Sequence, residues 1–384
     1  LKMLKIKIFI SNSLLYIQNF VLSSIQKIFW FRNPVNISNI LVYKVGNIGD
    51  LATAYPAIKI IRYKFPNAKI TLLTSTGDSK RIKTKNWKKG VSGASIFKNQ
   101  NILDDILYYE KLEFKSITKL IKKIRKKNFD RAFVMSASGT SFLREFRNLL
   151  FFKLLKINHV SGFNISLPSI FKKSFSLQKP YLLINEVDRN INNLDLGITF
   201  NKSFFDYKFP EINNNLKSEI NHLKNILVVA LGSKFQNRKW NRNKFESIAE
   251  RWLEEIGDVI FIGGKGDYED SNTIIENLKT YNFNNKSINF CGKTSIGESI
   301  YLINQSKAMI ANCSGPAHLA SFTSTKVVTI QSSYNFAKIW GSYFSTKYVL
   351  RPSFEISGKD IQNCKSINEI EVIEAWTSLN KIIN

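Results

Sequence analysis

The chain has 384 residues, of which 44% are hydrophobic and 13% aromatic, and this composition excludes a disordered protein. Because a single hydrophobic core rarely grows beyond about 250 to 300 residues, two domains are expected. Lys and Arg outnumber Asp and Glu by 56 to 29, and the formal charge of +27 favours anionic partners such as phosphorylated substrates, nucleic acids or anionic lipids. The three cysteines are odd in number and far apart, which favours a reducing compartment and argues against a disulfide framework or a zinc site.

Residues 1–38 form a basic amphipathic segment with a long uncharged stretch, residues 8–26, between lysines. Its length approaches that of a membrane span, but Ser, Asn and Gln residues interrupt it, so it is less apolar than a transmembrane helix. We interpret it as a helix at a membrane interface, with Phe29, Trp30 and Phe31 near the lipid headgroups. The alternative is a helix that packs on the surface of the protein itself.

From Asn39 onward, short apolar runs alternate with amphipathic stretches, the pattern of βα units that build a parallel sheet. This pattern predicts strands over 40–45, 69–74, 106–109 and 131–135, with helices over 51–64 and 117–127. The fold class is therefore α/β, and residues 39–180 are predicted to form an N-terminal Rossmann-like domain.

Residues 181–222 lack this periodicity and contain Pro210 and an Asn-rich stretch, so we expect the connection between the domains here. The pattern restarts in a second Rossmann-like domain, residues 223–365, with a helix over 242–256 and strands over 226–231, 259–262, 287–290, 308–311 and 326–330. Residues 366–384 predict a closing helix that buries one face, formed by Ile370, Ile373, Trp376 and Leu379.

The first predicted strand runs into the loop Gly46-Asn47-Ile48-Gly49-Asp50, and a helix follows at Leu51. Open α/β sheets bind their ligands at such positions, where the carboxyl end of a strand meets the N-terminus of a helix. Glycines let a ligand approach the backbone, whereas Asp50 can either cap the helix or accept a proton from a substrate hydroxyl. The spacing alone favours the role of Asp50 as a helix cap. The loop sequence matches neither a dinucleotide-binding motif nor a P-loop.

The second domain opens with a similar strand, which ends in a polar and basic loop. Hydroxyl, backbone and cationic groups in this loop suit a diphosphate, and the candidate ligands are Ser233, Lys234, Arg238 and Lys239. A solvated basic loop is the alternative, and Trp240 is expected to anchor the core rather than to stack on a base. Gly263 and Gly264 follow the next strand and can border the base or the ribose, although glycines are common at strand ends.

A third strand of the second domain leads through Asn312 and Cys313 into Ser314-Gly315-Pro316-Ala317-His318. Pro316 suits the first turn of a helix, where the Ser314 hydroxyl and backbone N–H groups, including that of Gly315, can bind phosphate or ribose oxygens. His318 lies one turn further along. It can face the same ligand or be a buried residue that only forms hydrogen bonds.

In their order along the chain, these motifs resemble glycosyltransferase family 9, the lipopolysaccharide heptosyltransferase family. The N-terminal signature of the family resembles residues 40–50 together with Pro56 and the segment 65–68. Its C-terminal domain resembles the segments 232–233, 238–240, 261–264, 292–295 and 314–318. The resemblance covers residues 39–351 and is strongest towards both ends of that range.

The resemblance implies a GT-B fold, in which two Rossmann-like domains with parallel sheets face each other across a cleft. The acceptor would lie on the N-terminal side, beside Gly46, Asn47 and Gly49, and the nucleotide sugar on the C-terminal side. Asp50 matches the catalytic base, which would deprotonate the acceptor hydroxyl in a single inverting displacement. The positions that match donor-binding residues are Ser233, Arg238, Ser314, Gly315 and His318. The resemblance implies no metal ion and no cofactor, with a nucleotide sugar such as ADP-heptose as co-substrate.

One departure from the family is Cys313, which occupies a position where the family usually has an acidic residue. A thiol cannot replace the charge-assisted hydrogen bonds of a carboxylate. Either Asn312 compensates, or the donor sugar differs, or activity is reduced. The alternatives to an ADP-heptose-dependent enzyme are therefore a transferase for another nucleotide sugar and a non-catalytic relative that binds nucleotide sugars.

The expected partners are a nucleotide sugar, a glycolipid or saccharide acceptor, and an anionic membrane surface. The expected location is the cytoplasm, peripheral on the inner face of the cytoplasmic membrane, where glycolipid acceptors are assembled. The net charge of +27 also raises the possibility of nucleic-acid binding, but the chain contains no recognised nucleic-acid motif, so we expect none.

Overall fold

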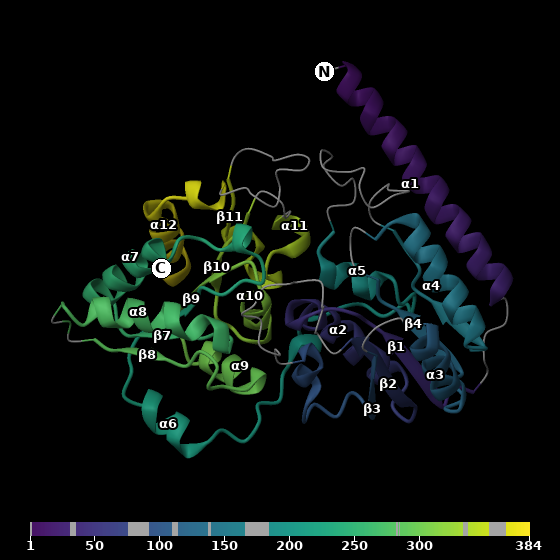
Figure 1. The fold of residues 1–384 in the computed structure, drawn as a ribbon, viewed down its shortest axis with the longest axis horizontal. Helices are drawn as coiled ribbons and strands as arrows, with labels where there is room; N and C mark the ends of the chain where they lie inside the picture. The colour runs from purple at the N-terminus through teal and green to yellow at the C-terminus, as the bar shows by residue number, and fades with distance from the viewer. Residues whose placement is uncertain are drawn as a thin grey trace. The chain divides into compact units, whose positions relative to one another are not determined.

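Two parallel β-sheets organise the chain, one in each of two compact units (Figure 1). The computed structural model describes residues 2–30, 36–75, 92–109, 114–136, 140–165, 184–281, 283, 285–332, 337–352 and 366–384. The first unit comprises Leu1–Asp78 and Gln100–Phe204, and the second comprises Ser79–Asn99 and Phe205–Asn384. The boundary at Phe204 falls within the predicted connection, whereas the short 3-10 helix η1 (Gly93–Phe97) belongs to the second unit, where it packs against α9 (Ile296–Asn304).

In the first unit, five described strands form a sheet in the order β3-β2-β1-β4-β5, with every pair parallel. The strands are β1 (Asn39–Tyr43), β2 (Lys69–Ser75), β3 (Asp105–Tyr109), β4 (Arg131–Val134) and β5 (His159–Ser161). The chain moves outward from β1 to β2 and β3 on one side and to β4 and β5 on the other. The carboxyl end of β1 is therefore the point where the strand order reverses, the usual ligand position in such sheets.

The described helices of the first unit are α1 (Lys2–Phe29), α2 (Ile48–Lys64), α3 (Phe114–Arg125), α4 (Phe142–Leu154) and α5 (Glu186–Asn192). Apolar side chains of α1, α3 and α4 pack with Leu41, Leu73 and Val134 of the strands in one core. Helix α2 begins at Ile48, three residues before the predicted start at Leu51. Its N-cap is Asn47, so Asp50 is the third residue inside the first turn.

Helix α1 lies along α4 and buries one side of its surface (Figure 1). Leu15, Gln18 and Leu22 are buried, whereas Tyr16 and Phe20 on the other side are 78% and 73% exposed. No described helix is long and apolar enough to cross a membrane.

The prediction that Trp30 lies near lipid headgroups is wrong. Its ring is buried and stacked on Phe163, and its indole N–H donates to the carbonyl of Ile157 at 2.9 Å. This hydrogen bond within the core satisfies the polar end of the side chain that would otherwise favour a lipid interface. Phe29 is partly buried beneath the Lys153 ammonium group, and Phe31 lies outside the described residues.

The second sheet has six described strands in the order β11-β10-β9-β6-β7-β8, again all parallel. They are β6 (Leu227–Ala230), β7 (Val259–Phe261), β8 (Ser287–Asn289), β9 (Ala308–Asn312), β10 (Val327–Ile330) and β11 (Val349–Leu350). The chain moves from β6 outward to β8 and then returns to β9 on the other side of β6. The strand order therefore reverses between β6 and β9, and this sheet has its own expected ligand position there.

The remaining described helices are α6 (Asn214–Ile220), α7 (Arg242–Glu255), α8 (Tyr268–Leu278), α9, α10 (Gly315–Leu319), α11 (Ala337–Trp340) and α12 (Val372–Ile383). Helices α7, α8 and α12 cover one face of the sheet, and Trp252 of α7 meets Trp376 of α12 edge to face. The predicted buried face of the closing helix was wrong at Ile373, which is 60% exposed. The helix begins at Val372, so Ile370 lies outside its periodicity and Ala375, Trp376 and Leu379 are the buried residues.

Candidate active site

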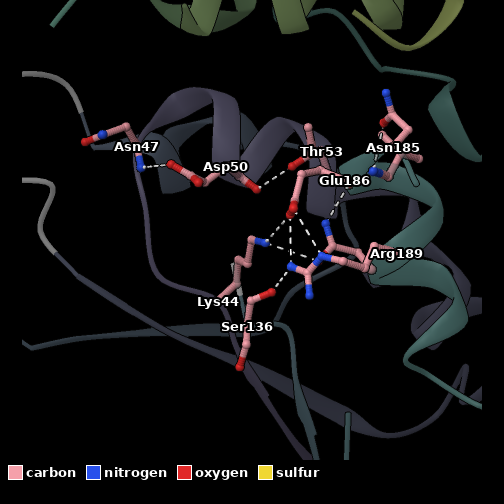
Figure 2. A network of polar contacts seen from close by, with 10 residues as sticks. Lys44, Asn47, Asp50, Thr53, Ser136, Asn185, Glu186 and Arg189 are labelled. Atoms are coloured by element: carbon pink, nitrogen blue, oxygen red, sulfur yellow. Dashed lines mark hydrogen bonds and ion pairs between the residues drawn. The ribbon is translucent and has the colours of Figure 1, made fainter. Parts of the chain in front are cut away.

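The loop after β1 depends on a glycine at position 46. Gly46 has a φ of +154°, and a Cβ atom added to it would lie 2.2 Å from the Cβ of Asp50. Any side chain at this position would displace the aspartate. The first turn of α2 therefore closes tightly onto the loop, and the Asn47 N–H donates to Asp50 Oδ2 at 2.8 Å (Figure 2). The capping contact that the sequence favoured is thus present.

Asp50 is only partly exposed. Desolvation raises the pKa of Asp50, while the Lys44 ammonium group and the Asn47 N–H oppose this rise. A carboxylate with a raised pKa holds a proton more strongly and is a better general base than an ordinary surface carboxylate. Since Asp50 lies at the reversal point of the first sheet, it can act on a ligand bound there while it also caps the helix.

Beneath this loop lies a buried network of charged side chains (Figure 2). Lys44 follows β1 and is fully buried; its Nζ donates to Asn190 Oδ1 at 3.1 Å and lies 3.8 Å from Glu186 Oε2. Arg189 makes two hydrogen bonds to the Glu186 carboxylate, at 3.1 and 3.0 Å, and also donates to the carbonyl of Ser136. We call Lys44, Glu186, Arg189 and Asn190 the buried charge network.

Glu186, Arg189 and Asn190 all lie on α5 and were not predicted from the sequence. They fall within the stretch predicted as a connection, more than 130 residues after Asp50 in the chain. The only local signal is an acidic and a basic residue three positions apart, which is common on helix surfaces. Helix α5 instead packs against α2 and turns these side chains inward.

Three loops of the second unit meet at one edge of its sheet. They follow β7, β6 and β9, which are neighbouring parallel strands, so their carboxyl ends lie side by side. The candidate residues on these loops are Gly263 and Gly264 after β7, Ser233 and Lys234 after β6, and Ser314 and Gly315 after β9. The structure thus places these residues, which are up to 82 positions apart in sequence, at the same edge of the second sheet.

Arg238 and Lys239 lie on the segment between β6 and α7. The Arg238 guanidinium stacks over the Phe235 ring at 4.8 Å from its centre, and Lys239 interacts electrostatically with Asp267. Trp240 is buried, its indole N–H donates to the Ile370 carbonyl at 2.9 Å, and it meets Phe245 edge to face. The prediction that Trp240 anchors the core is confirmed.

Asn312 ties the loops after β6 and β9 together. Its side-chain oxygen accepts from the Trp240 N–H at 3.0 Å, and its side-chain nitrogen donates to the Leu231 carbonyl at 2.7 Å. The residue is completely buried. The suggestion that Asn312 compensates for the missing acidic residue is therefore wrong, because its amide is used to hold the backbone.

Cys313 is buried at the end of β9 with its thiol already engaged. Gln331 Nε2 donates to its sulfur at 3.2 Å, and the thiol lies 3.7 Å from the Trp340 carbonyl. Ser314 is the N-cap of α10, and its buried hydroxyl has no hydrogen-bond partner among the described residues. His318 is buried and meets Trp340 edge to face, with ring centres 6.2 Å apart.

Asp267 is a further candidate that sequence reasoning missed. Its carboxylate packs where Gly232 and Gly263 have no side chain, since added Cβ atoms would lie 2.3 and 2.7 Å from its Oδ2. It also accepts from the Gly264 N–H at 2.9 Å, and desolvation raises its pKa. The glycines after β6 and β7 thus make room for an acidic group, which offers an acceptor for hydroxyl groups at this edge of the sheet. Within the described residues, no group of three His, Cys, Asp or Glu side chains is placed to hold a metal ion.

Comparison with known proteins gives a family and a fold for this chain. A family model described as glycosyltransferase family 9 (heptosyltransferase) matches residues 117–344. The chain is 24% identical over 292 residues to lipooligosaccharide heptosyltransferase 2 of Campylobacter jejuni, an alignment that covers 76% of this chain and 80% of that protein.

Two solved structures are similar across almost their whole length. A family 9 glycosyltransferase from Veillonella parvula has a TM-score of 0.66 at 17% identity, covering 91% of this chain and 98% of that one. The ADP-heptose LPS heptosyltransferase II of E. coli has a TM-score of 0.60 at 16% identity, covering 90% and 98%. With a parallel sheet in each unit, these likenesses confirm the predicted α/β fold of the GT-B type.

Proposed function

The chain belongs to glycosyltransferase family 9, and we propose that it transfers a heptose from ADP-heptose to a lipopolysaccharide-type saccharide acceptor. The names of two relatives support this choice. The C. jejuni relative is a lipooligosaccharide heptosyltransferase, and the similar E. coli structure is an ADP-heptose LPS heptosyltransferase.

In the proposed reaction, Asp50 is the general base. The proton of the acceptor hydroxyl moves to the Asp50 carboxylate, and the oxygen forms a bond to the anomeric carbon of the donor. The bond between that carbon and the diphosphate oxygen breaks, and ADP leaves on the opposite face, so the configuration inverts. The observation that carries this proposal is the partly exposed Asp50 carboxylate at the strand-order reversal of the first sheet, with a raised pKa.

We propose that side chains, and not a metal ion, stabilise the departing diphosphate. The loop after β6 supplies three cationic residues, Lys234, Arg238 and Lys239, beside the strand-order reversal of the second sheet. Cations and backbone N–H groups placed where charge develops are an effective way to stabilise such a leaving group. Asp267 would bind sugar hydroxyls at the same edge.

A donor panel tests the proposed substrate and the absence of a metal requirement. We expect transfer from ADP-heptose with EDTA present, and a larger rise in melting temperature with ADP-heptose than with UDP-glucose, since a ligand that binds only the folded state stabilises it. The measurements are ADP release and thermal unfolding. Preference for another nucleotide sugar would refute ADP-heptose as the donor. Loss of turnover in EDTA would refute the proposal that no metal ion is needed. Turnover with any donor would exclude a non-catalytic relative.

We further propose that α1 and α4 dock on an anionic membrane, on the cytoplasmic side where glycolipid acceptors are assembled. Both helices expose large apolar side chains, among them Tyr16, Ile17, Phe20 and Val21 on α1 and Leu143, Leu150 and Leu154 on α4. Lys27 and Lys153 lie on the same two helices and supply positive charge. Exposed apolar side chains and basic residues on the same helices match the requirements for binding at an anionic interface.

Replacing Phe20 with aspartate should weaken binding to vesicles that contain anionic lipid by about tenfold or more, because one buried Phe contributes about 1.5 to 3 kcal/mol. Co-sedimentation with such vesicles measures the effect. Ile373→Asp is the matched control, since Ile373 is similarly exposed but lies on α12 of the second unit. Equal vesicle binding by Phe20→Asp and the wild type would contradict the proposal that α1 and α4 dock on the membrane.

A further inference from the structure

Lys44 carries a buried charge immediately before the Asp50 loop. A lysine that is taken out of water keeps its charge only when anionic or hydrogen-bonding groups replace the water. Burial lowers the pKa of Lys44, and the Glu186 carboxylate opposes this change most strongly. Asn190 provides the hydrogen-bond acceptor at 3.1 Å. The ammonium group is therefore held in one place, with Asp50 among the charges that act on it.

The formal charges of Lys44, Glu186, Arg189 and Asp50 sum to zero when Asp50 is ionised. Lys44 and Arg189 bring two positive charges, and Glu186 brings one negative charge that both of them share. One positive charge is left, and Asp50 is the second acidic residue whose charge acts on Lys44. In Figure 2, Lys44 lies beneath the first turn of α2, which carries Asp50. Glu145 of α4 acts on Arg189, and burial raises its pKa to about 7. Asp50 differs from Glu145 because its charge acts on Lys44 itself.

A chain of hydrogen bonds also connects Lys44 to the backbone of Asp50. Asn190 accepts from Lys44 and donates to the carbonyl of Thr53 at 3.2 Å. The Thr53 hydroxyl in turn donates to the carbonyl of Asp50 at 3.0 Å. The first turn of α2, which carries Asp50, is thereby fixed relative to the ammonium group.

We propose that Lys44 is a positioning residue for the reaction. Its ammonium group, held by Glu186 and Asn190 beneath the first turn of α2, supplies the positive charge that keeps Asp50 ionised and ready to accept a proton. Glu186 and Arg189 have the supporting role of keeping Lys44 charged. This inference rests on the proposed function, in which Asp50 is the base.

The test is the pH profile of kcat for Lys44→Met, which removes the charge but keeps a long unbranched side chain. Without the cation, Asp50 takes up its proton at a higher pH. The acidic limb of the kcat profile should therefore move to higher pH by about one pH unit. Turnover should fall about tenfold on that limb and return close to the wild-type value well above it, with the KM for the donor unchanged. Lys59→Met is the control, because Lys59 lies on α2 and binds the Ser203 carbonyl instead.

Asn190→Asp provides a second variant of almost unchanged shape. The new carboxylate beside Lys44 competes for its charge, so the acidic limb should again move to higher pH. A uniform loss at every pH, or an unmoved limb in both variants, would overturn the role of Lys44. If Asp50→Asn is inactive but the acidic limb does not move in the Lys44 and Asn190 variants, only the role of Lys44 is rejected. If Asp50→Asn stays active, the proposal that Asp50 is the base is rejected.

Discussion

Replacing Asp50 with asparagine should lower kcat by about a thousandfold, within the range expected when a general base is removed. The amide has the same shape and its oxygen can still accept from the Asn47 N–H, so the first turn of α2 should persist. It cannot take up the proton of the acceptor hydroxyl. Since the donor-site candidates all lie in the second unit, the affinity for ADP should change little. Turnover and calorimetric titration with ADP measure the two effects.

The matched control for this prediction is Asp270→Asn. Asp270 is also an aspartate in the first turn of a helix, but it lies on α8 and forms an exposed ion pair with Arg242 at 3.5 Å. Its replacement should leave turnover near the wild-type value. If Asp50→Asn retained more than about a tenth of the wild-type kcat, another group would have to accept the proton.

Replacing Glu186 with alanine should be the most destabilising of the changes considered, with a loss of about 3 to 5 kcal/mol in the free energy of unfolding. Glu186 is completely buried between Lys44 and Arg189, at 3.8 and 3.0 Å. Its removal leaves two buried positive charges close together without their shared counter-ion. Denaturant unfolding of the wild type and the variant measures the difference.

Glu276→Ala is the comparison for an exposed pair. Glu276 binds Lys279 at 2.8 Å on the surface of α8, where both side chains are more than half exposed. Exposed ion pairs contribute about 1 kcal/mol or less, so this variant should unfold almost like the wild type. Equal stabilities of Glu186→Ala and Glu276→Ala would show that the buried charge network is not a coupled unit.

Local sequence patterns predicted the strands well because a buried parallel strand needs a short apolar run with turn residues at its ends. The predicted strands 69–74 and 308–311 differ from β2 and β9 by one residue each. The predicted ends of helices were less accurate where a capping hydrogen bond determines the first residue of the helix. Helix α2 begins at Ile48 because the Asp50 carboxylate accepts a hydrogen bond from the N–H of Asn47, the N-cap residue, and hydrophobic periodicity does not reveal this contact.

The sequence by itself determined the α/β class, the two parallel sheets and the glycine loop that presents Asp50, because these follow from apolar spacing and from residues that are close in the chain. Only the tertiary structure decided which charges surround that aspartate. Glu186 and Arg189 reach Lys44, below the loop that carries this aspartate, through the packing of α5 on α2. Asp267 reaches the loops after β6 and β7 through the space left by two glycines. Electrostatic interactions depend on distance in space and on burial, and neither is encoded in the local pattern.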